Sequence, residues 1–260
     1  MQMNKLVTRL ALTVLVCASS LVFAETAKPT IVLVHGAFAG SSSWNGVIKI
    51  LEQDGYTVIA AANPLRGVKS DAQSITSLIK EIKSPVVLVG HSYGGPVISE
   101  AAYGQANVKA LVYVAAFAPA AGESAVALTG KFPGATLGPT LGAPVALEGG
   151  GKDLYIQQDK FPAQFAEDVP LADARLMAAT QRPVTEAALN EAATDAAWKT
   201  IPSWWIFGDK DKNIPPQAMQ FMADRAKSKQ TVIVKGASHV VMISNPKPVA
   251  QIIEAAAKAQ

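Results

Sequence analysis

A serine in a glycine-rich turn is the first feature of this 260-residue chain that could do covalent chemistry. Residues 90–94 read Gly-His-Ser-Tyr-Gly and fit the pattern G-x-S-x-G, in which a sharp turn between a strand and a helix strains the serine and exposes its hydroxyl. The apolar stretch 85–89 before it predicts a strand buried on both faces. Pro96 after it suits the first turn of a helix. The pattern therefore predicts that Ser92 is a nucleophile.

A serine hydroxyl is a weak nucleophile at neutral pH and needs a base, which a carboxylate holds in the right tautomer. The chain has three histidines. His91 is next to Ser92, but successive residues in such a turn point apart. His35 follows the first predicted strand, where we expect it to shape the loop through backbone hydrogen bonds. His239, in the loop after the last predicted strand, is therefore the predicted base.

The acidic partner of this base has three candidates in the sequence. Asp209 and Asp211 both follow the predicted strand 203–207, and either could reach a histidine from the loop at the end of that strand. Glu123 follows the predicted strand 108–117 and is a more distant third.

The elements that must position these residues alternate along the chain. Predicted strands cover residues 30–34, 56–62, 85–89, 108–117, 203–207 and 231–234, and predicted helices cover 45–53, 70–82, 96–103, 217–227 and 248–257. Residues 70–73, Ser-Asp-Ala-Gln, resemble a capping box at the start of the second helix. We expect Trp44 to anchor the first helix in the core. The alternation predicts a doubly wound, mostly parallel sheet with helices on both faces.

Residues 119–200 interrupt this alternation and are called the cap below. From 119 to about 151 the chain is rich in Gly, Pro and Ala with little periodicity, and short helices are predicted over 161–167, 171–180 and 184–193. We expect a small helical cap or lid over the active site. For most of its large apolar residues core packing is the favoured role. These residues are Phe132, Tyr155, Phe161, Phe165, Met177 and Trp198.

The length suits one α/β domain with an insertion. Lys5 and Arg9 precede an apolar run over residues 10–23, and small residues follow, so residues 1–24 are predicted to be a secretory signal peptide. The run is too short for a comfortable membrane span. We therefore expect export to the periplasm or the medium without stable membrane insertion, and a core formed by residues 25–118 and 201–260.

The single cysteine, Cys17, lies inside this run. Its removal leaves no disulfide, thiol nucleophile or cysteine-bound metal. A lipoprotein would begin at Cys17, but Val16 is bulky for the small-residue position before such a cysteine. Loss of Lys5 and Arg9 also lowers the formal charge from +3 to about +1, so nothing suggests a nucleic-acid partner.

Three stretches of the chain resemble the α/β-hydrolase superfamily, close to its branch of esterases and hydroxynitrile lyases. They are VLVHGAF with SSW within residues 32–44, VGHSYGG at 89–95 and ALVYVAAFAP at 110–119. The resemblance covers nearly all of the chain after the signal peptide and is weakest over residues 122–151. It implies an α/β-hydrolase fold, no cofactor and a triad of Ser92, Asp211 and His239.

The resemblance also bears on the acid and on the oxyanion hole. The family pattern has a glycine, an aspartate three residues later and, three residues after the aspartate, an apolar residue followed by a proline. Gly208, Asp211, Ile214 and Pro215 match it, which favours Asp211 over Asp209. The family pattern implies that the backbone N–H groups of Phe38 and Tyr93 hold the oxyanion.

The expected activity is hydrolysis of a small-molecule carboxylic ester, of small or medium chain length, with no metal or cofactor. The same fold supports hydroxynitrile lyases, but known lyases of this branch have a lysine directly after the histidine, where this chain has Val240. Perhydrolase activity and a non-catalytic, ligand-binding homologue are further alternatives. Haloalkane and epoxide chemistry uses an aspartate nucleophile, and Ser92 argues against both.

Overall fold

The structure, a computed structural model, describes residues 28–259. The predicted signal peptide at residues 1–24 lies outside the described residues. Within residues 28–259, no helix combines the length and the apolar character needed to cross a membrane.

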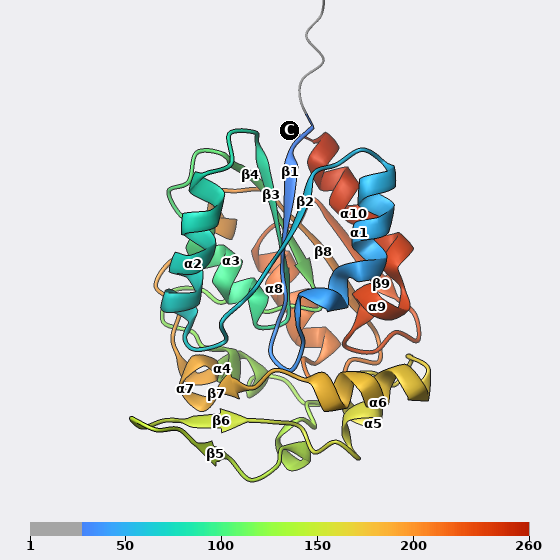
Figure 1. The fold of residues 1–260 in the computed structure, drawn as a ribbon. Helices are drawn as coiled ribbons and strands as arrows, with labels where there is room; N and C mark the ends of the chain where they lie inside the picture. Colours follow the sequence, from blue (N-terminus) through green and yellow to red (C-terminus); the bar gives the residue numbers. More distant parts are fainter. Residues whose placement is uncertain (1–27, 260) are drawn as a thin grey trace, which may run out of the picture.

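A six-stranded sheet forms the centre of the molecule, in the strand order β2-β1-β3-β4-β8-β9 (Figure 1). Every neighbouring pair is parallel. The strands are β1 (Thr30–Val34), β2 (Val58–Ala61), β3 (Val86–His91), β4 (Val108–Val114), β8 (Ser203–Gly208) and β9 (Gln230–Val234). The doubly wound parallel sheet predicted from the sequence is confirmed.

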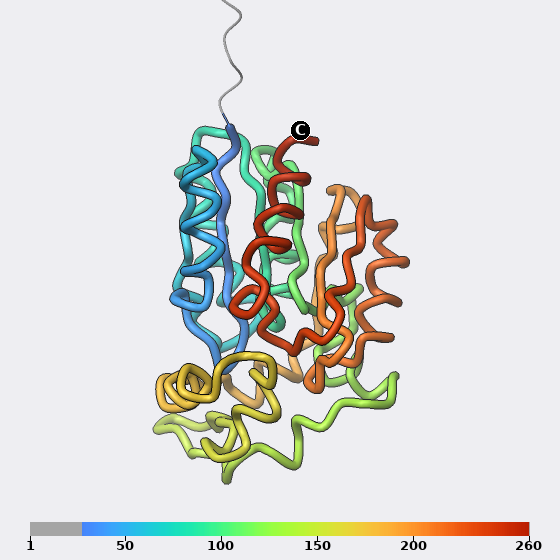
Figure 2. Tube along the Cα trace, turned by 90° about the vertical axis from the view of Figure 1, so that its right-hand side faces the viewer, coloured from blue at the N-terminus to red at the C-terminus, as the bar shows by residue number. Residues whose placement is uncertain are grey.

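Helices cover both faces of this sheet (Figures 1 and 2). On one face lie α1 (Asn45–Gln53) and α10 (Pro246–Lys258), which pack against each other. On the other lie α2 (Val68–Lys80) and α3 (Gly94–Ala102), and α8 (Pro216–Arg225) packs on β8. Strands β1, β3 and β8 are buried along their whole length, as expected for parallel strands between two helical layers. Trp44 is fully buried before α1, as predicted.

The cap lies against the carboxyl ends of the strands (Figure 1). Its helices are α4 (Ala125–Thr129), α5 (Phe161–Phe165), α6 (Leu171–Thr180) and α7 (Glu186–Asn190), and its antiparallel sheet is formed by β5 (Val145–Ala146), β6 (Lys152–Leu154) and β7 (Val184–Thr185). The prediction of an irregular and helical cap missed this sheet. Strands of two or three residues are too short to show a period of two, and the partner of β6 in β7 is distant in the sequence.

Two local predictions are corrected by the structure. Helix α2 begins at Val68 with Gly67 as its N-cap, so residues 70–73 do not form a capping box. The Asp71 carboxylate instead accepts the backbone N–H of Arg66, at 3.1 and 3.2 Å. A short helix that was not predicted, α9 (Val241–Ser244), begins almost directly after His239.

Candidate active site

Ser92 lies in the turn between β3 and α3, where its backbone has a φ of +53°. This left-handed conformation costs a non-glycine residue about 1 to 2 kcal/mol. The serine N–H donates to the Ala115 carbonyl at 3.1 Å. A Cβ on Gly94 would lie 2.5 Å from the Val34 carbonyl oxygen, so the turn needs glycine there. The strained turn predicted from G-x-S-x-G is therefore present.

His239 and Asp211 form a buried pair beside this turn. Nδ1 of His239 lies 2.7 Å from Oδ2 of Asp211, and both side chains are almost fully buried. The other carboxylate oxygen accepts the N–H groups of Asn213 at 2.8 Å and Ile214 at 3.0 Å. These bonds fix the carboxylate, which in turn favours the His239 tautomer with its proton on Nδ1. Nε2 is then the atom that can accept a proton.

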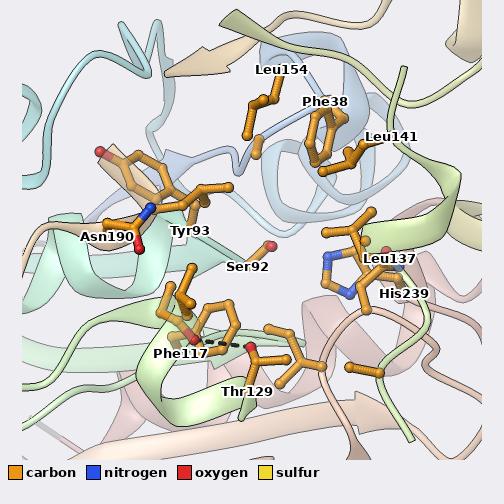
Figure 3. Close-up of a pocket in the computed structure, with 18 of the residues that line it drawn as sticks. Phe38, Ser92, Tyr93, Phe117, Thr129, Leu137, Leu141, Leu154, Asn190 and His239 are labelled. Atoms are coloured by element: carbon orange, nitrogen blue, oxygen red, sulfur yellow. Dashed lines mark hydrogen bonds between the residues drawn. The ribbon is translucent and has the colours of Figure 1, made fainter. Parts of the chain in front are cut away.

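Ser92 and His239 line the same cavity, and Figure 3 shows both side chains there. In the described part of the chain no hydrogen bond joins the two side chains. Bonds between a nucleophile and its base are often long without substrate and shorten in the complex. The structure thus brings all three predicted residues to one place and joins two of them directly.

The two alternative acids are occupied elsewhere. Asp209 accepts the backbone N–H of Gly236 at 2.6 Å. Glu123 lies between Lys131 at 2.6 Å and Arg225 at 2.8 Å. Burial raises the pKa of the Glu123 carboxyl, but hydrogen bonds from Lys131, the Ala120 N–H and Arg225 outweigh burial and lower it to about 2. Neither carboxylate contacts His239.

His35 is bonded as a loop-shaping histidine should be. Its Nδ1 donates to the Gly36 carbonyl at 2.9 Å, and its Nε2 accepts the Asn63 N–H at 3.1 Å. Burial lowers its pKa to about 4; the bond to Gly36 opposes this shift, and the charge of Arg182 adds to it. A ring with both nitrogens occupied has no free atom for proton transfer.

His91 supports the loop that carries His239. Its Nε2 donates to the His239 carbonyl at 3.1 Å, and the two rings lie 4.8 Å apart between centroids. Burial, and then the neighbouring His239, hold its pKa well below the usual value. The neutral ring therefore contributes a hydrogen bond and packing.

The structure corrects one of the predicted oxyanion donors. The backbone N–H of Phe38 donates to the Arg182 carbonyl of the cap at 3.0 Å, so it is not available to an oxyanion. Ala37, the preceding residue, lines the cavity, as does Tyr93. Among residues 28–259, neither of these two backbone N–H groups has a hydrogen-bond acceptor. Ala37 and Tyr93 are thus the pair of free amides next to Ser92.

The cavity has a volume of about 450 Å³ and is lined mainly by apolar side chains from both the core and the cap (Figure 3). Its lining includes Phe117, Leu137, Leu141 and Leu154, with no lysine or arginine. Glu186, which is exposed, is its one carboxylate. Within residues 28–259, no three His, Cys, Asp or Glu side chains are grouped so that they could hold a metal ion.

Phe165 of α5 is a cap residue that packs against the histidine of the predicted triad. Its ring lies edge-on to His239, with 5.0 Å between centroids, and to Phe38, with 6.0 Å. It lines the cavity, whereas Phe161 and Trp198 pack in the core as predicted. No sequence signal distinguishes Phe165 from the other aromatic residues of the cap, because the helices around it are short and weakly periodic.

Comparison with known proteins agrees with the fold described above. Residues 31–252 match the sequence model of the Alpha/beta hydrolase family. Over 242 residues the chain is 26% identical to an alpha-hydroxynitrile lyase of Arabidopsis thaliana, covering 85% of this chain and 93% of the lyase. Over 248 residues it is 25% identical to methylesterase 8 of the same plant, covering 86% and 87%.

Among solved structures, the chain is similar to that of polyneuridine aldehyde esterase. The TM-score is 0.76 at 19% sequence identity, over 88% of this chain and 99% of that one. This likeness confirms the predicted α/β-hydrolase fold.

Proposed function

The chain belongs to the alpha/beta hydrolase family, and within it we propose that the protein hydrolyses carboxylic esters with Ser92 as nucleophile. The observation that carries the proposal is the strained Ser92 beside a His239 whose Nδ1 is bound to Asp211 at 2.7 Å. A serine next to an oriented histidine is the arrangement that acyl transfer requires. The match to a methylesterase supports the same reaction class.

In the proposed reaction, Ser92 Oγ attacks the ester carbonyl carbon while Nε2 of His239 takes the hydroxyl proton. The carbonyl electrons move to the oxygen, and the backbone N–H groups of Ala37 and Tyr93 hold the resulting oxyanion. Each such donor is worth about 3 to 4 kcal/mol in the transition state. Asp211 stabilises the imidazolium.

Collapse of this intermediate expels the alcohol, which takes the proton from His239, and leaves the acyl group on Ser92. Water then attacks the acyl-enzyme, losing a proton to His239, and a second collapse releases the acid and restores the serine. No step needs a metal or a cofactor.

The cavity indicates which esters suit this site. A largely apolar lining of about 450 Å³ favours a neutral substrate of small or medium size. Because no lysine or arginine lines the cavity, an anionic substrate would lose hydration without gaining a partner.

The proposal is tested by release of p-nitrophenol from acetate, butyrate, octanoate and palmitate esters, without added metal. We expect turnover of the shorter esters, and Ser92→Ala should lower kcat by about 10⁵- to 10⁶-fold. Circular dichroism and thermal unfolding of this variant establish that it is folded. A folded wild-type protein that cleaves none of the four esters would refute the proposal.

Cyanohydrin cleavage is the second candidate, because one relative is an alpha-hydroxynitrile lyase. The residue after His239 is Val240, which is fully buried, and no lysine lines the cavity. A departing cyanide anion would therefore have no lysine or arginine beside it. Benzaldehyde release from mandelonitrile, measured beside ester hydrolysis, separates the two activities.

We also propose that residues 1–24 direct export and are then removed. The basic residues and apolar run at this end of the chain support it. Mass spectrometry of the exported protein should give a chain that begins at about Glu25.

A further inference from the structure

The residue after the predicted nucleophile is a tyrosine whose side chain is anchored at its far end. Tyr93 is 1% exposed, and its phenol donates to Oδ2 of Asp71 at 2.9 Å. Asp71 is fully buried on α2, the helix that packs against α3. The hydrogen bond therefore joins the turn that carries Ser92 to a separate element of the core.

Asp71 accepts this bond without a cation beside it. No ion pair formed by residues 28–259 includes Asp71, and its other partners are backbone N–H groups of the loop before α2, among them that of Arg66. Burial raises the pKa of its carboxyl, although hydrogen bonds from the Arg66 N–H, the Tyr93 phenol and the N–H groups of Gly67 and Leu65 oppose this shift. A buried carboxylate without an ion pair is costly to keep, and the reaction proposed above does not use it.

We propose that Asp71 is a positioning residue for the oxyanion hole and acts through the side chain of Tyr93. The inference rests on the proposed ester hydrolysis. The Tyr93 N–H is one of the two free amides beside Ser92, and it shares its Cα with the anchored ring. Fixing the phenol limits rotation about that Cα and keeps the N–H directed at the position of the oxyanion.

The placement of this amide matters because catalysis depends on small displacements. A donor acts fully only at about 2.7 to 3.1 Å from the oxyanion, and a misplacement of about 1 Å can cost about a hundredfold in rate. Ser92 is itself in a strained conformation, so we expect the turn to shift toward a less strained one when the hydrogen bond of the Tyr93 phenol is lost. Loss of the phenol should therefore lower the rate of the chemical step more than the binding of substrate.

Asp71 also supports the cap, which makes Tyr93→Phe the cleaner variant. The loop before α2, held by the bond between Arg66 and Asp71, accepts two hydrogen bonds from Thr185 of the cap. The Arg66 guanidinium reaches Asp153 of β6 at 2.6 Å. Changing Asp71 could thus move the cap, whereas Tyr93→Phe removes one hydroxyl and leaves this loop bonded.

The chain offers a matched control for a lost buried phenol. Tyr113 of β4 is fully buried, and its hydroxyl lies 2.7 Å from Ser99 Oγ of α3. Tyr113→Phe removes the same atom from a buried hydrogen bond, here one to a neutral hydroxyl, away from the cavity. It should lower the melting temperature as Tyr93→Phe does, and leave kcat within about twofold of wild type.

The experiment measures kcat and KM for p-nitrophenyl butyrate in wild type, Tyr93→Phe, Tyr113→Phe, Asp71→Leu and the double variant Asp71→Leu/Tyr93→Phe. We expect Tyr93→Phe to lower kcat about tenfold with KM within about twofold. The double variant should have a kcat no lower than Asp71→Leu alone, because both changes break one interaction. If Asp71→Leu does not fold, the comparison of Tyr93→Phe with Tyr113→Phe decides.

A kcat of Tyr93→Phe within twofold of Tyr113→Phe would overturn the proposal, as would a change confined to KM. So would a double variant whose loss in kcat equals the product of the two single losses.

A second assay separates this failure from failure of the proposed ester hydrolysis. In reaction with an alkyl fluorophosphonate, Ser92 Oγ attacks phosphorus, His239 takes its proton and fluoride leaves. Should wild type cleave no ester, slower labelling of Tyr93→Phe than of Tyr113→Phe still supports the positioning role. Equal labelling, or none, overturns it.

Discussion

Asp209 and Asp211 lie two residues apart in one loop, yet their carboxylates bind different partners. Asp209 accepts the backbone N–H of Gly236 at 2.6 Å, whereas Asp211 accepts Nδ1 of His239 at 2.7 Å. Asp211 is buried and Asp209 is exposed. Both aspartates were candidates for the acid that binds His239, and only Asp211 makes that contact.

This difference predicts unequal effects of the two amide substitutions. Asp211→Asn should lower kcat for p-nitrophenyl butyrate by about 10³- to 10⁴-fold, because an amide favours the wrong His239 tautomer. Asp209→Asn is the matched control and should stay within about threefold of wild type. A larger loss for Asp209→Asn, with both variants folded, would reverse the assignment of the acid.

Gly36 gives a second prediction, since it touches the turn of Ser92. A Cβ at Gly36 would lie 2.6 Å from Ser92 Cβ and 2.7 Å from the His91 carbonyl oxygen. Gly36→Ala must therefore separate the loop of Ala37 from the nucleophile, and we expect kcat to fall at least about a hundredfold. Thermal unfolding should show a loss of about 1 to 3 kcal/mol in stability.

Gly142→Ala is the control for this substitution. A Cβ there would meet its nearest atom, the Tyr155 carbonyl oxygen, at 3.8 Å, which is ordinary contact. Its activity should lie within about twofold of wild type. Comparable activity of the Gly36 and Gly142 variants would mean that the loop can move without disturbing the site.

The sequence predicts the parts of the site that depend on local pattern. Ser92 is marked by a buried strand, a glycine turn and a helix in succession, and His239 by its place after the last strand. These features arise from residues adjacent in the chain. The oxyanion loop is different: Phe38 was predicted as a donor, but the Arg182 carbonyl takes its N–H. A contact between such distant residues has no trace in local pattern.

The cap illustrates the same limit. Its sheet pairs β5 with β6 and β6 with β7 through two residues each. Pairs this short show no period in the sequence, and the pairing of β6 with β7 joins segments about thirty residues apart. The hydrogen bond between Tyr93 and Asp71 was also missed. Residues 70–73 were predicted to be a capping box, but α2 begins at Val68, and Asp71 instead accepts the Tyr93 phenol. The match to a local motif gave no sign that Asp71 would bind a residue 22 positions away.

Leu154 of β6 gives a third prediction, on substrate size. It is 7% exposed and lines the cavity from the cap. Leu154→Trp should fill part of that space and lower kcat/KM for the octanoate ester about tenfold more than for the acetate ester. Leu176→Trp is the control, because Leu176 is 65% exposed and lies outside this cavity. An unchanged ratio of the two esters in Leu154→Trp would place the acyl chain elsewhere.

A fourth prediction concerns stability in acid and follows from His35. Burial, opposed by the bond to Gly36 and helped by the charge of Arg182, lowers its pKa from 6.5 to about 4. The unfolded chain then binds more protons than the folded one between these values. The contribution of His35 is complete above pH 6.5 and is lost as the pH falls through about 4. Its size is about 3 kcal/mol.

Urea unfolding at pH 7, 6, 5 and 4 measures this loss, and His35→Gln removes the titrating ring. The variant should be less stable at pH 7, because it loses the bond that His35 Nε2 accepts from Asn63. Its stability should nevertheless fall less steeply between pH 6.5 and 4. His91, whose pKa is also lowered by burial, remains in both proteins and accounts for the slope that persists. Parallel curves would mean that His35 is protonated without cost, and an NMR titration of its ring would then give a pKa near 6.5.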